Sequence, residues 1–162
     1  MTRDYAVENV KKVLSKAMTD VFEKLDITVM GVGWSLRTRD DYVIVEKDFI
    51  GGSGVSLPGR AECLDFADIF VRQLYMYLCA KGNVLSRQSG EQPGAIVTDH
   101  YIFSIYGQHS PALADETICL VAAVRLGWIT LTKAIEMAKI TDDNHPDGNT
   151  VFLGNNWNLH DL

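Results

Sequence analysis

Three long segments of the chain repeat apolar residues at every third or fourth position, which is the spacing of an amphipathic helix. They cover residues 5–25, 65–80 and 110–126, and polar residues fill most of the positions between the apolar ones. A fourth, shorter helix is predicted for residues 130–140, with a threonine at its start as the cap.

Four other segments carry the β-branched and aromatic residues that are typical of strands. The first pair is residues 27–36 and 42–45, the latter extending toward Phe49, and a short polar turn separates its members. The second pair is residues 95–98 and 101–106, with a two-residue spacer between them. Each pair therefore predicts an antiparallel β-hairpin.

The order of these elements predicts the fold class. Because the strands arrive in pairs, the sequence favours an α+β fold over a doubly wound nucleotide fold, in which single strands alternate with helices. We expect a mixed sheet built from two β-hairpins with helices packed on it. Residues 1–140 are predicted to form a single domain, followed by an Asp/Asn-rich arm or tail over residues 141–162. This last segment is an ordered arm if Val151, Phe152, Leu153 and Trp157 find a surface, and otherwise a tail.

Composition narrows the class of protein further. The chain has 162 residues, of which 47% are hydrophobic and 22% are charged, as in ordinary globular domains. Its net charge of -6 argues against binding to a nucleic-acid polymer, which needs a basic face. No apolar run approaches the roughly 20 residues of a membrane span. The charged N-terminal stretch also lacks the apolar core of a secretory signal. We therefore expect a cytoplasmic protein without membrane contact.

The three cysteines, Cys63, Cys79 and Cys119, lie far apart and each stands in an apolar context. This context predicts buried, reduced thiols. No CxxC pair is present, and the two histidines of the arm, His145 and His160, would form a poor metal site. The sequence therefore assigns no metal ligands.

A glycine-rich loop is the first candidate for a ligand-binding site. Gly51, Gly52, Ser53 and Gly54 follow the first predicted hairpin, and Arg60 lies shortly after them. Consecutive backbone N–H groups in such a loop can hold an anion, with the arginine as counter-charge. The spacing matches neither a P-loop nor a dinucleotide fingerprint. A flexible connector between strand and helix is the structural alternative.

The polar corner after the second hairpin is the second candidate. Gly107 would turn the chain out of the sheet, so that His109 and the helix start at Ser110 face the glycine loop across a shared cleft. Asp115 and Glu116 follow in the predicted first helical turn, where carboxylates favour the positive end of the helix dipole. That role alone would explain the two acids.

Four short stretches together resemble the GlcG/HbpS-like family, the "haem-degrading domain" group. They are PGAIVTD at 93–99, YIFSIYG at 101–107, the acidic pair at 115–116 and the alanine pair at 122–123. The resemblance implies a profilin-like α/β fold, assembly into oligomers, and binding of a tetrapyrrole, a metal or a small metabolite. The bulky FADIFVRQLYMYL segment departs from the family pattern.

Two kinds of function remain open at this point. The first is a small-molecule or cofactor-binding protein of GlcG/HbpS-like type, whose cofactor the sequence does not identify. The alternative is an acidic protein-interaction module, such as a phage or defence-related inhibitor, or a sponge for a signalling nucleotide. No catalytic motif is evident, so the sequence does not decide whether the protein is an enzyme. The aromatic surplus of residues 65–80 predicts a homo-oligomer, a dimer or larger.

Overall fold

The computed structural model describes these parts of the chain: residues 3–28, 31–52, 54–82, 94–108, 110–140 and 145–160. Their helices and strands are, in chain order, α1 (Arg3–Lys24), β1 (Gly31–Thr38), β2 (Ile44–Gly51), α2 (Leu57–Lys81), β3 (Ala95–Val97), β4 (Tyr101–Tyr106), α3 (Ala112–Arg125), α4 (Leu131–Lys139) and α5 (Thr150–Leu153). The predicted single-domain α+β fold is confirmed. None of the described helices is long and apolar enough to cross a membrane.

Both predicted hairpins are present, and they join into one four-stranded sheet with the order β2-β1-β4-β3. Strands β1 and β4 meet at its centre, where Gly33 lies opposite Tyr106 and Leu36 opposite Phe103. Every ladder is antiparallel, so the expectation of a mixed sheet is wrong in this respect. The reason is that the two hairpins join through β1 and β4, which run in opposite directions.

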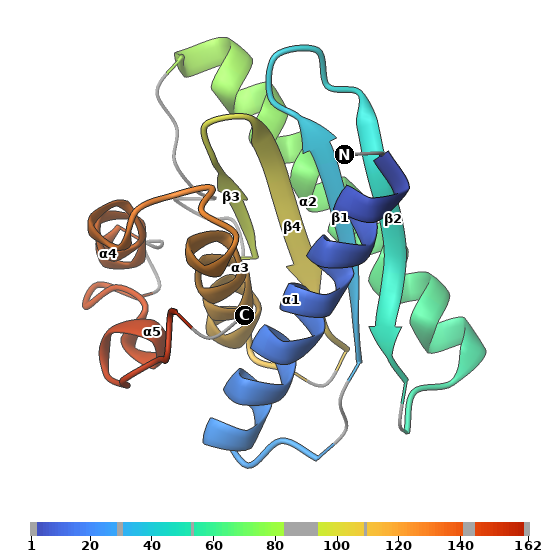
Figure 1. Ribbon diagram of the computed structural model, residues 1–162, viewed down its shortest axis with the longest axis vertical. Helices are drawn as coiled ribbons and strands as arrows, with labels where there is room; N and C mark the ends of the chain where they lie inside the picture. The colour runs from blue at the N-terminus through green and yellow to red at the C-terminus, as the bar shows by residue number, and fades with distance from the viewer. Residues whose placement is uncertain are drawn as a thin grey trace.

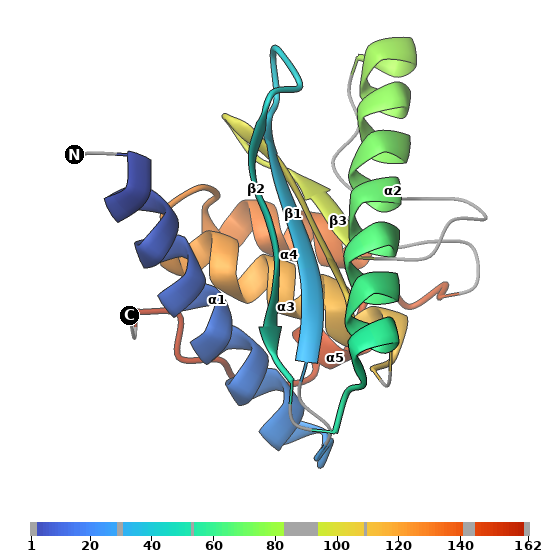
Figure 2. The ribbon, with the colours of Figure 1, turned by 90° about the vertical axis from the view of Figure 1, so that its right-hand side faces the viewer.

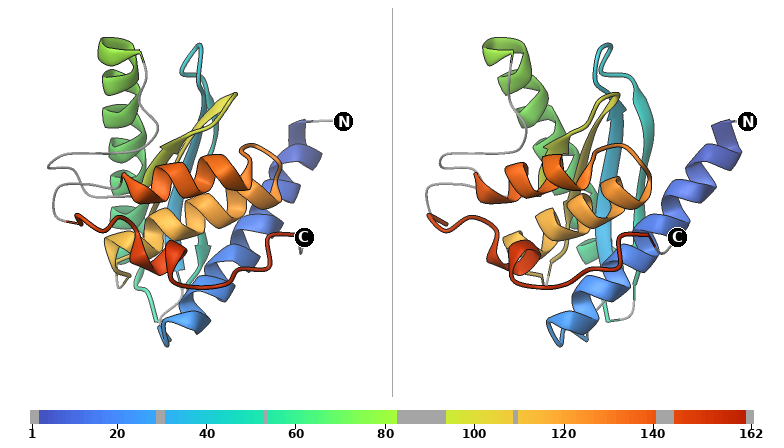
Figure 3. Two further views of the ribbon diagram at one scale, coloured as in Figure 1. Left: turned by 90° about the vertical axis from the view of Figure 1, so that its left-hand side faces the viewer. Right: turned by 60° about the vertical axis from the view of Figure 1, so that its left-hand side comes forward.

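Helices cover both faces of the sheet and build a layered molecule. Figure 2 shows the sheet from its edge, with α2 alone on one side and α1 and α3 on the other. Helices α1 and α3 lie side by side across that second face (Figure 1). Helices α4 and α5 form a further layer outside α3 (Figure 3). Because α3 is covered on both sides, it is the central helix of the fold.

The main core lies between the sheet, α1 and α3. Alternation along β1 points Val32, Trp34 and Leu36 into this core, and all three are buried. On β4, Phe103 and Ile105 point the same way. Tyr106 points to the opposite face, as alternation along the strand requires, and packs on the aromatic rings of α2.

Helix α2 lies unusually close to the sheet because small residues line the contact. A Cβ atom added to Gly33 would lie only 2.6 Å from the backbone nitrogen of Leu64. On the neighbouring strand, the Ser104 hydroxyl donates a hydrogen bond to the carbonyl oxygen of Ala67. Ser35 donates to Asp68 Oδ1 over 3.1 Å. The helix backbone therefore rests directly on the two central strands.

The start of α2 differs from the prediction. The helix begins at Leu57, eight residues before the predicted start, so the glycine-rich connector is shorter than expected. The Ser56 hydroxyl caps it by accepting the N–H of Gly59, and Pro58 occupies its first turn. These two helix-start signals outweigh the low helix propensity of Gly59.

The exposure of α2 also corrects one expectation about its side chains. Cys63 and Cys119 are buried free thiols as predicted, but Cys79 is exposed, because it lies on the side of α2 that faces away from the sheet. Part of the aromatic surplus has partners within the chain. The ring of Tyr75 stacks on that of Tyr42 at 4.3 Å, and other rings of α2 pack on β4. Self-association therefore stays a prediction.

The close seat of α2 predicts the effect of one added methyl group. Gly33→Ala should lower the free energy of unfolding by about 1–3 kcal/mol, because the new Cβ meets helix backbone that cannot rotate away. Urea unfolding measures this change, and amide hydrogen exchange should show the loss of protection first in α2. A variant as stable as the parent, with unchanged exchange in α2, would refute the close contact.

Candidate functional site

The structure gives the predicted glycine loop a clear internal organisation. Gly51, Gly52 and Gly54 all have positive φ angles of 86°, 127° and 81°, which favour glycine. Arg60 reaches back from α2 and donates to the carbonyl oxygen of Gly52 at 3.2 Å and to that of Val55 at 3.3 Å. These contacts clamp the loop. Its predicted role in ligand binding stays a prediction.

The predicted corner lies beside the first turn of α2, and its shared cleft with the glycine loop stays a prediction. A Cβ atom on Gly59 would lie 2.6 Å from Gln108 Oε1, so the corner touches the first turn of α2. Ser53 and His109 fall outside the described residues. Ser110 does not cap α3, because the N-cap residue is Pro111. Instead, the Ser110 hydroxyl donates to the side chain of Asp115.

The acidic pair near the start of α3 is buried, which the sequence does not predict. Burial raises the pKa of Asp115 well above its ordinary value of 3.8, while hydrogen bonds from Ser110 and the Gly107 backbone lower it. Burial also raises the pKa of the Cys119 thiol, and the nearby charges of Asp115 and Glu116 raise it further. Asp115 lies against Gly94 and the corner residues Gly107 and Ser110, on the sheet side of α3, whereas Glu116 faces Asn149 of the arm.

Glu116 ties the C-terminal arm to α3. Asn149, which is fully buried, donates from Nδ2 to Glu116 Oε1 at 3.0 Å and to the carbonyl oxygen of Leu113 at 3.1 Å. Its Oδ1 accepts the N–H of Phe152 at 3.0 Å and so caps α5. The described part of the arm is thus fixed at the first turn of α3.

An apolar cavity of about 230 Å³ lies between α4, α5 and the arm. Its apolar walls are Leu131, Ile135, Phe152, Leu153, Trp157 and Leu159. Asn155 and Asn156 complete the lining. Leu131 is 47% exposed and Leu153 is 37% exposed, so the cavity opens to solvent between α4 and α5. The Trp157 indole is held in place by its Nε1, which donates to the carbonyl oxygen of Phe152 at 3.1 Å.

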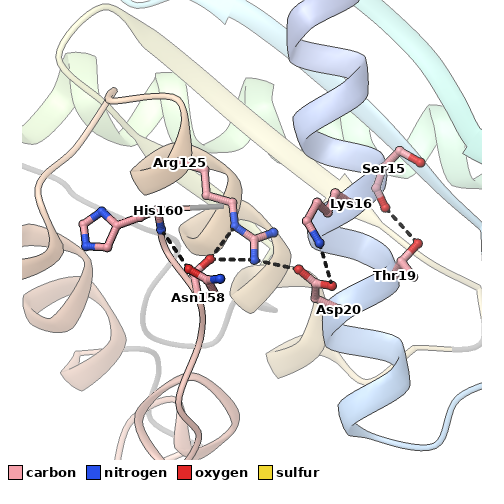
Figure 4. A network of polar contacts seen from close by, with 7 residues as sticks. All are labelled: Ser15, Lys16, Thr19, Asp20, Arg125, Asn158 and His160. Carbon is pink, nitrogen blue, oxygen red and sulfur yellow. Dashed lines mark hydrogen bonds and ion pairs between the residues drawn. The ribbon is translucent and has the colours of Figure 1, made fainter. Parts of the chain in front are cut away.

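A second cavity of about 360 Å³ adjoins the first and is charged. Asn156 and Trp157 belong to the walls of both cavities. Arg125, at the end of α3, binds the carbonyl oxygen of Asn158 through Nε at 3.0 Å and Nη2 at 2.8 Å. Its Nη2 also lies 2.6 Å from Asp20 Oδ2 on α1 (Figure 4). One residue therefore joins α1, α3 and the arm around this cavity.

Sequence reasoning did not find this pair of cavities. Its signals were present, because Phe152 and Trp157 are among the few apolar residues of a polar arm. The unbroken apolar run over residues 118–124 in α3 also indicates a helix that is covered on all sides. What no local pattern shows is that Arg125 meets Asp20, which lies 105 positions earlier in the chain.

Comparison of the chain with protein-family models, with curated proteins and with solved structures finds no match. The described residues contain no group of three or more His, Cys, Asp and Glu side chains placed to hold a metal ion. The fold and the two cavities, rather than a relative, therefore carry the functional argument.

The buried Asp115 predicts a specific dependence of stability on pH. Because its pKa is raised in the folded state, the unfolded state gives up the proton first, and stability falls as pH rises above about 4. The Asp115→Asn variant should not lose stability in this way. Its free energy of unfolding relative to that of the parent should therefore increase with pH, by up to about 1.4 kcal/mol per pH unit.

Chemical unfolding of both proteins at intervals from about pH 4 to about pH 7 measures the difference. Asp147→Asn, at an exposed position in the arm, is the matched control and should follow the parent at every pH. A stability difference between Asp115→Asn and the parent that does not change with pH would contradict the raised pKa.

Proposed function

We propose that this protein binds a small molecule, and that an apolar group of the ligand occupies the cavity between α4, α5 and the arm. The observation that carries the proposal is the cavity itself, which six apolar side chains line and which opens to solvent. Apolar pockets with a few polar groups on the wall are the usual form of small-molecule sites. Here the side-chain amides of Asn155 and Asn156 supply those polar groups.

The volume of the cavity sets the size of the group that fits. A dry cavity of roughly 150 Å³ holds benzene, so about 230 Å³ accepts a phenyl ring or a short branched alkyl group. The neighbouring charged cavity extends the site beyond the apolar group. The two together reach the range of typical ligand sites.

The proposal agrees with the class of function that the GlcG/HbpS-like resemblance implies, but it places the site elsewhere. The guanidinium of Arg60 already donates hydrogen bonds to the carbonyl oxygens of Gly52, in the glycine loop, and of Val55, directly after it. The cavity at the arm, in contrast, holds unfilled apolar volume. Filling such volume with an apolar group removes apolar surface from water, at about 25 cal/mol per Å². This gain favours the cavity over the loop as the binding site.

Filling the cavity from the protein side should abolish binding. We expect 4-phenyl-1-butanol to bind the parent saturably in titration calorimetry, and Leu153→Trp to lose this binding, because the larger side chain takes the space of the phenyl ring. Thermal melting should show that the variant stays folded, since Leu153 is partly exposed.

Leu57→Trp is the matched control. Leu57 is 77% exposed at the start of α2, away from the cavity, so this variant should bind like the parent. Equal binding by the parent and Leu153→Trp would show that the compound binds elsewhere. No binding to the parent would overturn the proposed function.

A further inference from the structure

The guanidinium of Arg125 has one donor group that no described residue uses. Its side chain is 1% exposed, and Nε and Nη2 are engaged by Asn158 and Asp20. Nη1 is buried as well, but it has no hydrogen-bond partner within the described part of the chain. In Figure 4 this nitrogen points away from Asn158, toward α1. A buried donor without an acceptor is costly, so this position favours a ligand that brings an oxygen atom.

The charges around Arg125 favour an anionic oxygen. Asp20 forms ion pairs with two cations, since its Oδ2 pairs with Arg125 and its Oδ1 lies 3.5 Å from Lys16 Nζ. Among the described residues that line the cavity, three are basic and two are acidic, the others being Lys24 and Glu23, so these side chains sum to a charge of +1. The lining of this cavity is therefore positively charged, although the net charge of the whole chain is -6.

Helix dipoles oppose an anion here, but weakly. Helix α1 ends at Lys24 and α3 ends at Arg125, and each C-terminus carries roughly half a negative charge. That field falls off within the last turn, and a basic residue occupies the last turn of both helices. Lys16 lies eight residues, or about 12 Å, before the end of α1. The full charges of Arg125 and Lys16 therefore act on a bound anion more strongly than the two helix dipoles do.

We propose that the ligand is an amphipathic carboxylate: Arg125 Nη1 binds its carboxylate in the charged cavity, Lys16 adds its charge, and the apolar group lies in the apolar cavity. The proposal rests on the proposed function, because it requires an occupied apolar cavity. Asn156 and Trp157, which line both cavities, would contact the middle of such a ligand. The class of ligand is thus an aryl or short alkyl chain that ends in a carboxylate.

A matched pair of compounds separates the carboxylate from the rest of the ligand. 4-Phenylbutyrate and 4-phenyl-1-butanol share the phenyl ring and the chain, and they differ only in the charged end. Calorimetry at neutral pH should show about tenfold tighter binding of the carboxylate to the parent, as expected for a charge-assisted hydrogen bond. Arg125→Lys, if its melting shows it folded, should lose most of this preference and keep only the roughly threefold part that Lys16 supplies, because lysine has no third nitrogen to offer.

Lys16→Gln keeps the test decisive if the Arg125 variant does not fold. Lys16 is partly exposed, so the variant should fold normally and lose about threefold in affinity for 4-phenylbutyrate, with no change for the alcohol. Lys12→Gln, at an exposed position of the same helix that does not line the cavity, is the control and should change neither affinity.

The outcomes distinguish this inference from the proposed function. If both compounds bind equally to the parent and Leu153→Trp abolishes both, the apolar site stands and the carboxylate inference fails. The inference also fails if the carboxylate binds more tightly but Lys16→Gln and Lys12→Gln leave its affinity unchanged. If neither compound binds to the parent, both proposals fail together.

Discussion

The buried guanidinium of Arg125 is the constraint on which the candidate site depends. A buried charge is tolerated only when it is paired, and removal of one partner from such a pair typically costs about 3–5 kcal/mol. Arg125 lies on α3, and its partners lie on α1 and in the arm. The need to satisfy this one side chain therefore fixes three segments, distant in sequence, around the charged cavity.

The arm is held at both ends of α3, and this double attachment creates the apolar cavity. Asn149 binds Glu116 at the first turn of α3, and Asn158 binds Arg125 at its last residue. Between these two ties the arm follows α3 (Figure 3), and its residues Phe152, Leu153, Trp157 and Leu159 line the apolar cavity together with Leu131 and Ile135 of α4. These two attachments give polar groups of Asn149 and Asn158 hydrogen-bond partners. The space between the two attachments can therefore remain apolar.

The sequence predicts the elements better than it predicts the site. Periodicity finds the helices and the paired strands, because those patterns are local, whereas it places the start of α2 late despite the cap at Ser56. It does not predict that Asp115 is buried, because Gly94, which lies against its Cβ atom, is 21 positions earlier in the chain. The cavities require the long-range meeting of Arg125 and Asp20, which no spacing rule contains. Phe152 and Trp157 were the available signal, since apolar residues in a polar arm need a surface.

The central claim is that a ligand binds beside Trp157, and the three tryptophans of the chain allow a direct test. Trp34 is buried in the main core, and Trp128 packs on Tyr101 at 4.7 Å, so neither lines the cavities. Protein labelled with 5-fluorotryptophan should give three fluorine resonances, which single tryptophan-to-phenylalanine variants assign. Titration with 4-phenylbutyrate should shift the resonance of Trp157 and leave the other two in place. A Trp157 resonance that stays fixed while the compound binds would contradict the account.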